Sequence, residues 1–452
     1  MNLTNSIEKA FKRFLPSPFT IAAILTLSTI LLAYFFTDSD KGNHFVNILK
    51  YWENGIWNSK LLSFAYKMIL ILVLGHILVL SKPIEVLINR IVKLVTSTET
   101  AVLLVSFTTM LISFLNWGLG LIFGAILARK VAEYALKNNI KINYPIVGAA
   151  GYVGLMIWHS GLSGSAPLDA AGKGRIKDLL SNTSLINIPE QINTNETIFS
   201  NWNIITFIIL LTIIPSFLYF VAKKTKPTKI ELNEYKINKE PSQLNGAERL
   251  DHSKKLSIIL GGILLITFFV KYGESLLKLN FTLNAINLLM LSLCILFHKR
   301  FYNFLLALEE AIKDTSGILI QFPLYFGIMG IMTSSGMVAQ ISDYFTTIAS
   351  EKTLPIFTFI SAGIVNLFVP SGGGQWVIQG PIILESALKL GVPLPKAIMA
   401  IAYGDQITNM LQPFWALPLL AITKLKAKEI LPYTLMLLVV GTIIYITSLL
   451  II

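Results

Sequence analysis

Long stretches of apolar residues, separated by short basic segments, dominate the chain. Stretches such as 17–36, 61–80, 202–222 and 431–452 hold about 20 residues each with very few charges. An α-helix needs about this length to cross a hydrocarbon core about 30 Å thick. A transmembrane barrel would instead show short strands of alternating polarity. The pattern therefore predicts an all-α polytopic membrane protein.

Composition supports this interpretation and excludes other classes. Hydrophobic residues make up 54% of the 452 residues and charged residues 14%, whereas soluble domains carry about 25% charged residues. The formal net charge of +12 is concentrated in loops, where basic residues set membrane orientation, so we expect no nucleic-acid partner. Cys294 is the only cysteine, which rules out an intrachain disulfide.

Basic residues between the apolar stretches predict the orientation of the chain. Because Lys and Arg collect on the cytoplasmic side, we expect the N-terminus, with Lys9, Lys12 and Arg13, in the cytoplasm. The apolar stretch within 98–129 has basic segments on both sides, so a single crossing would place one of them outside. A re-entrant hairpin with its tip at "NWGLG" (116–120) resolves this conflict. A single tilted span is the alternative.

The same reasoning applies to the second half. Segment 223–255 holds nine Lys and Arg against five Asp and Glu, which predicts a cytoplasmic linker. Segment 355–388 carries "PSGGGQ" at its middle, and the lysines at 424–428 stay inside only if this segment doubles back as a hairpin that opens outside. The C-terminus is then expected on the outer side, and the protein as a whole in the cytoplasmic membrane.

Each half thus contains a hairpin followed by an interrupted span. We expect about nine spanning helices, two re-entrant hairpins and an inverted structural repeat with discontinuous helices, which is typical of secondary transporters. The expected units are the first repeat 1–222 (hairpin 98–129, broken span 143–172), the linker 223–255 and the second repeat 256–452 (hairpin 355–388, broken span 397–423). Lys173, Arg175 and Lys177 fall on the predicted outer face, and the charge rule does not explain them.

Three consecutive glycines inside "VPSGGGQWVIQGP" (369–381) predict a break in a helix, because each costs about 1 kcal/mol relative to alanine there. Irregular backbone at membrane depth is tolerated only where protein or water satisfies its polar groups. The break leaves amide groups at a new helix N-terminus, which attracts an anion such as a carboxylate. Ser371, Gln375 and Gln379 add side-chain hydrogen bonds. A loop that only connects two spans is the alternative.

Polar residues in "YGDQITNMLQPFW" (403–415) indicate an ion site. Asp405, Asn409 and Gln412 lie at i, i+4 and i+7, on one face of a helix. An ionisable residue inside a membrane span is a functional candidate. Asp405 can bind Na⁺, together with Asn409, or carry a proton. An Asp that caps the helix after Gly404 is the alternative.

"WHSGLSGSAPL" (158–168) supplies the matching break in the first half. Ser163 and Ser165 can donate to a carboxylate, and His159 can carry a proton because its pKa lies near neutrality, or can serve as a structural hydrogen-bonding residue. The predicted substrate-binding residues are Asn116, Gly118, Ser163, Gly164, Ser165, Asn366, Ser371, Gly372, Gly373, Gly374, Gln375 and Gln379. The predicted ion-coupling residues are Asp405, Asn409, Gln412 and His159.

Motifs of enzymes are absent from the sequence. It contains no HExxH, Walker A or GxSxG motif and no cysteine–histidine metal spacing. We therefore expect neither an enzyme nor a cofactor beyond the coupling ion.

Three motifs resemble those of the bacterial short-chain fatty acid transporter family, which includes acetoacetate and butyrate uptake carriers. They are "NLFVPSGGGQWVIQGPI" (366–382), "WHSGLSGSAPL" (158–168) and "YGDQITNMLQPFWALP" (403–418), and the resemblance runs nearly from end to end. The sequence departs at Ser160, where the family leads us to expect glycine. By resemblance, the site candidates are Asn116, Ser163, Ser165, Asn366, Ser371, Gly372 to Gly374, Gln375, Asp405 and Asn409.

The resemblance implies a carrier of small monocarboxylates, coupled to H⁺ or Na⁺, with kinship to hairpin-containing and commonly dimeric elevator-type transporters. Trp117, Trp376 or Trp415 is expected to contact the short apolar tail. Two other functions stay open: a cation/proton antiporter that uses Asp405, and a carrier of another small organic anion such as a dicarboxylate. A membrane enzyme that acts on acyl chains would need a nucleophile–base arrangement that the sequence lacks.

Overall fold

The computed structural model describes residues 18–38, 42–180, 188–230, 232, 246–277, 283–313 and 316–451. All regular elements within these ranges are helices. The prediction of an all-α fold is therefore confirmed. Residues 231 and 233–245 of the linker predicted at 223–255 lie outside the described residues. Lys9, Lys12 and Arg13 at the N-terminus lie outside them as well.

The helices follow the predicted pattern of apolar stretches, with additional short elements. The first half contains α2 (Pro18–Phe36), α3 (His44–Ile56), α4 (Ser59–Leu80), α5 (Lys82–Val92), α6 (Thr98–Leu115), α7 (Trp117–Lys137), α8 (Tyr144–Ala150), η1 (Val153–Met156), η2 (Trp158–Ser160), α9 (Ser165–Ala170), α10 (Arg175–Leu179) and α11 (Asn201–Ala222). The second half contains α12 (Glu248–Asp251), α13 (Lys254–Leu277), α14 (Leu283–His298), α15 (Phe301–Lys313), α16 (Ser316–Ser334), α17 (Met337–Thr347), α18 (Leu354–Phe368), α19 (Gly372–Leu390), α20 (Leu394–Thr408), η3 (Asn409–Leu411), α21 (Pro413–Thr423) and α22 (Ala427–Ile451).

Both predicted hairpins are pairs of helices separated by a short break. α6 ends at Asn116, whose side chain accepts a hydrogen bond from Leu119 N and so begins α7. Ser371 begins α19 in the same way, by accepting from Gly374 N. A short polar side chain at the break satisfies an amide that would otherwise lack a partner at the new helix N-terminus.

The arms of the first hairpin are longer than expected. α6 has 18 residues and α7 has 21, so the pair extends to Lys137 and not to residue 129. At 1.5 Å per residue α6 is about 27 Å long, close to the thickness of a hydrocarbon core. Arm length therefore does not distinguish a re-entrant hairpin from two spans, and re-entry stays a prediction.

Both predicted broken spans are discontinuous. In the first, α8 ends at Ala150 and two 3-10 turns precede α9, so the break begins earlier than the expected glycine–serine stretch. In the second, α20 ends at Thr408 and a 3-10 turn separates it from α21. Asn409 and Gln412 consequently lie in the break, and the expectation that they share one continuous helical face with Asp405 is wrong.

The segment 37–60, which separates the first two apolar stretches, contains the helix α3. This helix packs along α16, where Gly55 lies opposite Gly327 and Gly330, and the small residues let the two backbones approach closely. The short length and polar residues of α3 hid it from the search for apolar stretches.

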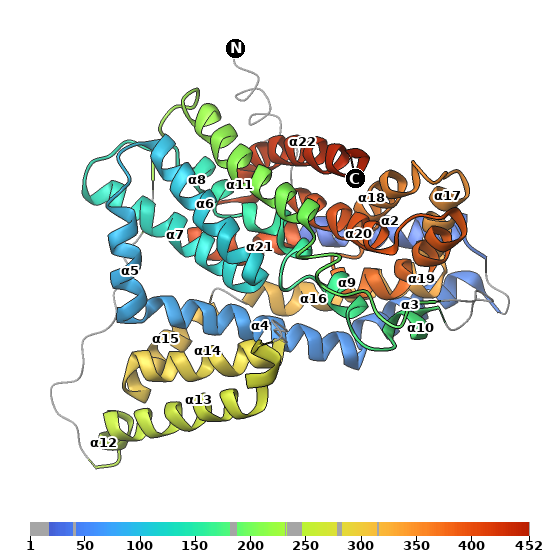
Figure 1. Ribbon diagram of the computed structural model, residues 1–452. Coiled ribbons are helices and arrows are strands. Elements are labelled where there is room, and N and C mark those ends of the chain that lie inside the picture. The colour runs from blue at the N-terminus through green and yellow to red at the C-terminus, as the bar shows by residue number, and fades with distance from the viewer. Residues whose placement is uncertain are drawn as a thin grey trace.

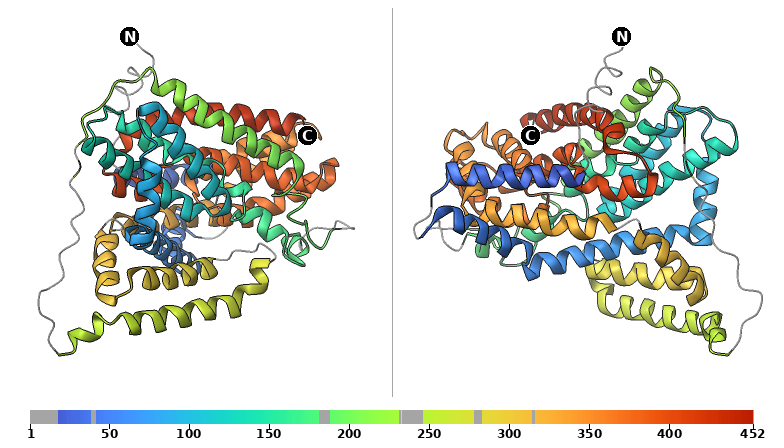
Figure 2. Two further views of the ribbon diagram at one scale, coloured as in Figure 1. Left: turned by 60° about the vertical axis from the view of Figure 1, so that its left-hand side comes forward. Right: turned by 180° about the vertical axis from the view of Figure 1, so that it is seen from behind.

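The hairpins and broken spans form one body, and a layer of other helices lies beside it. α18 and α20 run side by side, α21 packs on α7, and α11 lies along α22 (Figure 1). The long α4 runs beneath these helices in Figure 1, and α13, α14 and α15 form a further layer against it. From behind, α2 and α3 lie along α16 (Figure 2).

Fewer helices meet the requirements of length and apolar composition for a membrane span than the nine that we expected. In the described residues, four helices are long and apolar enough to cross a membrane, or up to six if each of two bent pairs counts as one span. Short apolar helices such as Leu354–Phe368 and the broken spans fail the length requirement. The number of crossings and the inverted repeat stay predictions.

The contact between α18 and α20 gives a test of the packing. A methyl group at Gly404 would overlap the carbonyl oxygen of Phe359, whereas a methyl group at Gly262 on α13 would meet nothing within 4 Å. Overpacking costs about 1–3 kcal/mol, and alanine in an open helical position gains up to about 1 kcal/mol. We expect Gly404→Ala to lower the thermal unfolding midpoint in detergent and Gly262→Ala to leave it unchanged or raised. Equal midpoints for the two variants would contradict this packing.

Candidate functional site

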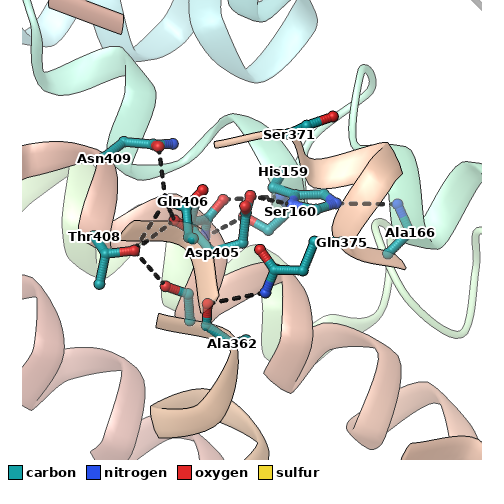
Figure 3. A network of polar contacts seen from close by, with 12 residues as sticks. His159, Ser160, Ala166, Ala362, Ser371, Gln375, Asp405, Gln406, Thr408 and Asn409 are labelled. Carbon is teal, nitrogen blue, oxygen red and sulfur yellow. Dashed lines mark hydrogen bonds and ion pairs between the residues drawn. The ribbon is translucent and has the colours of Figure 1, made fainter. Parts of the chain in front are cut away.

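A buried pair of His159 and Asp405 joins the two broken spans. His159 lies in η2 of the first break and Asp405 in the last turns of α20, 246 residues apart in the chain. Nδ1 of His159 lies 2.5 Å from Oδ2 of Asp405, and the two side chains are 0% and 1% exposed (Figure 3). Within the part of the chain that the structure describes, this pair is the only ion pair that joins the two breaks.

Hydrogen bonding assigns the proton in this pair. The amide of Ala166, in the first turn of α9, donates to Nε2 of His159 over 3.0 Å (Figure 3). Nε2 therefore acts as an acceptor, and the ring proton of neutral His159 belongs on Nδ1, where it is donated to Asp405. The arrangement suits a neutral imidazole beside a carboxylate, which leaves one buried negative charge.

The triple glycine of the second hairpin lies directly on this pair. A methyl group built on Gly372 would lie 2.7 Å from Cε1 of His159 and 2.8 Å from the ring of Trp158. Trp158 stacks on His159, with ring centroids 4.6 Å apart. Gly373 faces Ser165 at a wider distance of 3.6 Å. Glycine at position 372 thus permits a close approach of the hairpin backbone to the histidine ring.

Gln406 forms a second connection between the breaks. Its Oε1 accepts from Ser160 N over 3.0 Å, and its Nε2 donates to Ser160 Oγ and to the hydroxyl of Tyr445. Ser160 stands where the family resemblance led us to expect glycine, and its hydroxyl is part of this contact. The site-residue prediction omitted Gln406, although its amide in an apolar span was a visible signal.

Asn366 and Gln412 fasten the second hairpin to the second break. Nδ2 of Asn366 donates to the carbonyl of Asp405 at 2.8 Å and to Oδ1 of Asn409 at 3.0 Å. Nε2 of Gln412 donates to the carbonyls of Asn366 and Leu367. These carbonyls lie where helices end, so the amides replace hydrogen bonds that the broken backbone lacks.

Gln375 and Gln379 connect the two arms of the second hairpin. Nε2 of Gln375 donates to the carbonyl of Ala362 at 2.9 Å (Figure 3). It also donates to Oε1 of Gln379 at 2.7 Å. Nε2 of Gln379 donates to the hydroxyl of Ser361. Both side chains are fully buried. Their hydrogen bonds hold α18 against α19, which the sequence could not distinguish from a role in ligand binding.

The tip of the first hairpin is held by the first break. The amide of Trp117 donates to Oγ of Ser163 over 3.0 Å. Gly118 approaches the side chain of Ile71 on α4, and Gly164 packs against the carbonyl oxygen of His159. The structure therefore brings the predicted residues of the first half to the same junction as those of the second.

Buried polar atoms without a hydrogen-bond partner differ in kind between the two halves. Among the described side-chain amides and indoles near the breaks, the first half leaves two donors, Nδ2 of Asn116 and Nε1 of Trp158. The second half leaves three acceptors, Oδ1 of Asn366, Oε1 of Gln375 and Oε1 of Gln412. The hydrogen bonds described above fix which amide atom is left over in each case. Donors suit an anion and amide oxygens suit a cation.

The structure explains part of the basic cluster at 173–177. Arg175 forms an ion pair with Asp169, which raises the pKa of the guanidinium, and Oδ2 of Asp169 also accepts from Nε1 of Trp376. Lys173 lies 4.0 Å from Glu190. Trp376 thus connects the second hairpin to α9, whereas Trp117 and Trp415 contact each other.

The described residues hold no group of three or more His, Cys, Asp or Glu that could bind a metal ion. Na⁺ can still bind through one carboxylate with amide and backbone oxygens. The predicted Na⁺ site at Asp405 and Asn409 therefore stays a prediction.

Comparison with known proteins gives a family match across the whole chain. A family model described as short chain fatty acid transporter matches residues 1–452. A protein of Escherichia coli (strain K12), provisionally described as a short-chain fatty acid transporter, is 35% identical over 456 residues, which cover 99% of this chain and 98% of the relative. A Haemophilus influenzae protein with the same description is 35% identical over 432 residues and 93% of each chain.

Two solved structures show a weaker likeness. The YdaH transporter of Alcanivorax borkumensis aligns with a TM-score of 0.44 at 12% identity, over 95% of this chain and 97% of that one. MtrF of Neisseria gonorrhoeae, described as illuminating a class of antimetabolite efflux pumps, aligns with a TM-score of 0.46 at 14% identity, over 98% and 97%. At these TM-scores the likeness does not define the topology.

The triple glycine offers a matched test of the junction. Alanine at position 372 would press against His159 and Trp158, whereas alanine at position 373 would make an ordinary contact with Ser165. We expect Gly372→Ala to lower the thermal unfolding midpoint clearly more than Gly373→Ala, since only the first substitution separates the hairpin from the His159 ring. If the order of the two midpoints is reversed, the hairpin does not lie on His159 as described.

Proposed function

Because the chain belongs to the short-chain fatty acid transporter family, we propose that it is a secondary active carrier of short-chain monocarboxylates such as butyrate or acetoacetate. The family is one of multi-pass membrane transporters, in agreement with the absence of enzyme motifs. The proposed transport is coupled to H⁺ or Na⁺. The buried pair of His159 and Asp405, which joins the two discontinuous spans, is the observation that carries the coupling.

The unpartnered buried donors favour one carboxylate at the first break. Nδ2 of Asn116 and Nε1 of Trp158 can each donate to a carboxylate oxygen, and the hydroxyl of Ser163 is near the same hairpin tip. The second hairpin and the second break present acceptors, on Asn366, Gln375 and Gln412, which would repel a second carboxylate. A substrate with one carboxylate and an apolar tail therefore fits better than a dicarboxylate.

The second break favours a cation. Neutral His159 beside anionic Asp405 leaves a net negative charge in a buried environment, where an uncompensated charge is costly. H⁺ or Na⁺ at Asp405 would neutralise it, with Asn366 and Gln412 contributing amide oxygens to Na⁺. Together, one anion in the first break and one cation in the second leave the loaded site with the same charge as the empty one.

Alternating access would follow from movement of the junction relative to the surrounding helices. The proposed mobile unit contains the hairpins and broken spans, α6 to α9 and α18 to α21. The proposed scaffold contains α2 to α4 and α13 to α16. We further propose that the carrier lies in the cytoplasmic membrane with its N-terminus in the cytoplasm and its C-terminus outside, and that it forms a homodimer.

Neutralising Asp405 tests the coupling. In proteoliposomes, a tenfold pH or Na⁺ gradient supplies about 1.4 kcal/mol, enough for about tenfold accumulation of butyrate at one-to-one coupling. We expect wild type to accumulate radiolabelled butyrate under one of the two gradients. Asp405→Asn should lose this accumulation and retain exchange of labelled for unlabelled butyrate, because the amide cannot take up a proton and has no charge to neutralise.

Asp343→Asn, at an exposed aspartate on α17, is the matched control and should accumulate butyrate like wild type. Full accumulation by Asp405→Asn would remove Asp405 from the coupling site. Gradient-driven cation flux by wild type without any butyrate movement would instead favour the cation/proton antiporter.

A further inference from the structure

Three tryptophans from three different segments form a buried cluster at the junction. Trp117 begins α7 at the tip of the first hairpin, Trp158 lies in the first break and Trp415 lies in the first turn of α21. The ring centroids of Trp117 and Trp158 are 5.9 Å apart, and those of Trp117 and Trp415 are 5.1 Å apart. All three residues are between 6% and 7% exposed.

This tryptophan cluster borders the unpartnered donors described above. Trp158 stacks on His159 and carries one of these donors, Nε1. Trp117 follows Asn116, which carries the other, and its amide is held by Ser163. A carboxylate bound by these donors would have the indole rings of the cluster next to it.

Indoles are rigid, and buried side chains packed in mutual contact cannot yield space at no cost. A tail of two or three carbons requires little room beside the carboxylate. Each further methylene would have to displace a buried indole, and Trp117 contacts both of the other two. Packing in this cluster thus limits the chain length of the acid, whereas the hydrogen bonds to the carboxylate do not depend on that length.

We propose that Trp117, Trp158 and Trp415 set the upper limit on the chain length of the transported acid, with Trp415 closing the end of the tail site. This inference rests on the proposed function. Trp415 joins the cluster through Trp117, whereas Trp158 also stacks on His159 and Trp117 belongs to the hairpin tip. Replacing Trp415 is therefore the change that enlarges the tail site with the least disturbance of the polar junction.

The test measures initial uptake of butyrate, hexanoate and octanoate by proteoliposomes under the driving gradient found for wild type. We expect wild type to take up butyrate and to exclude octanoate. Trp415→Ala should raise the ratio of octanoate to butyrate uptake by about tenfold or more, the scale on which apolar pockets discriminate between chain lengths. Trp415→Phe, which keeps an aromatic ring, should give a smaller rise.

Trp202→Ala is the matched control, because Trp202 lies on α11 against Tyr403, outside the tryptophan cluster, and should leave the ratio unchanged. A gain of octanoate uptake cannot result from poor folding, which lowers the uptake of every acid. If Trp415→Ala does not fold, the ratio of octanoate to butyrate uptake by Trp415→Phe serves as the test. Retained butyrate uptake with an unchanged ratio would overturn the length limit and keep the proposed function, whereas absence of uptake of all three acids by folded wild type would overturn both.

Discussion

The junction depends on one constraint: backbone that leaves its helical hydrogen bonds inside a buried region must find other partners. Both broken spans and the second hairpin have such backbone, and nearly all the polar side chains at the junction serve it. The pair of His159 and Asp405 connects the two breaks directly. The amide of Ala166 fixes the histidine tautomer, and Gly372 lets the hairpin close over the ring. A single contact thus links charge, backbone and hairpin position.

This linkage relates the structure to transport. Neutralising Asp405 would change the environment of His159, the residue on which Gly372 of the second hairpin packs. A carboxylate bound near Asn116 and Trp158 would affect the same histidine, because Trp158 stacks on it. An anion and a cation can therefore influence one junction without touching each other. The remaining helices, among them α4 and the layer of α13 to α15, lie beside this junction (Figure 1).

Much of the fold could be predicted from the sequence, because long apolar stretches specify buried helices and glycine or a capping polar residue specifies where they stop. The hairpin tips were predicted at 116–120 from the flanking basic segments and at "PSGGGQ" from the triple glycine, and Asn116 and Ser371 begin a helix there. Partners across the junction could not be predicted, since the carbonyls that Asn366 and Gln412 bind become free only when distant segments break. Trp158 was missed for the same reason: an indole in an apolar stretch gives no sign that its N–H lacks an acceptor.

The most direct test of this account is a crystal structure with 4-bromobutyrate, in which the anomalous signal of bromine locates the end of the tail. We expect the bromine beside Trp117 and Trp415, with the carboxylate within hydrogen-bonding distance of Nδ2 of Asn116 or Nε1 of Trp158. A bromine peak on the other side of the pair of His159 and Asp405, with the carboxylate facing Asn366 and Gln412, would contradict it.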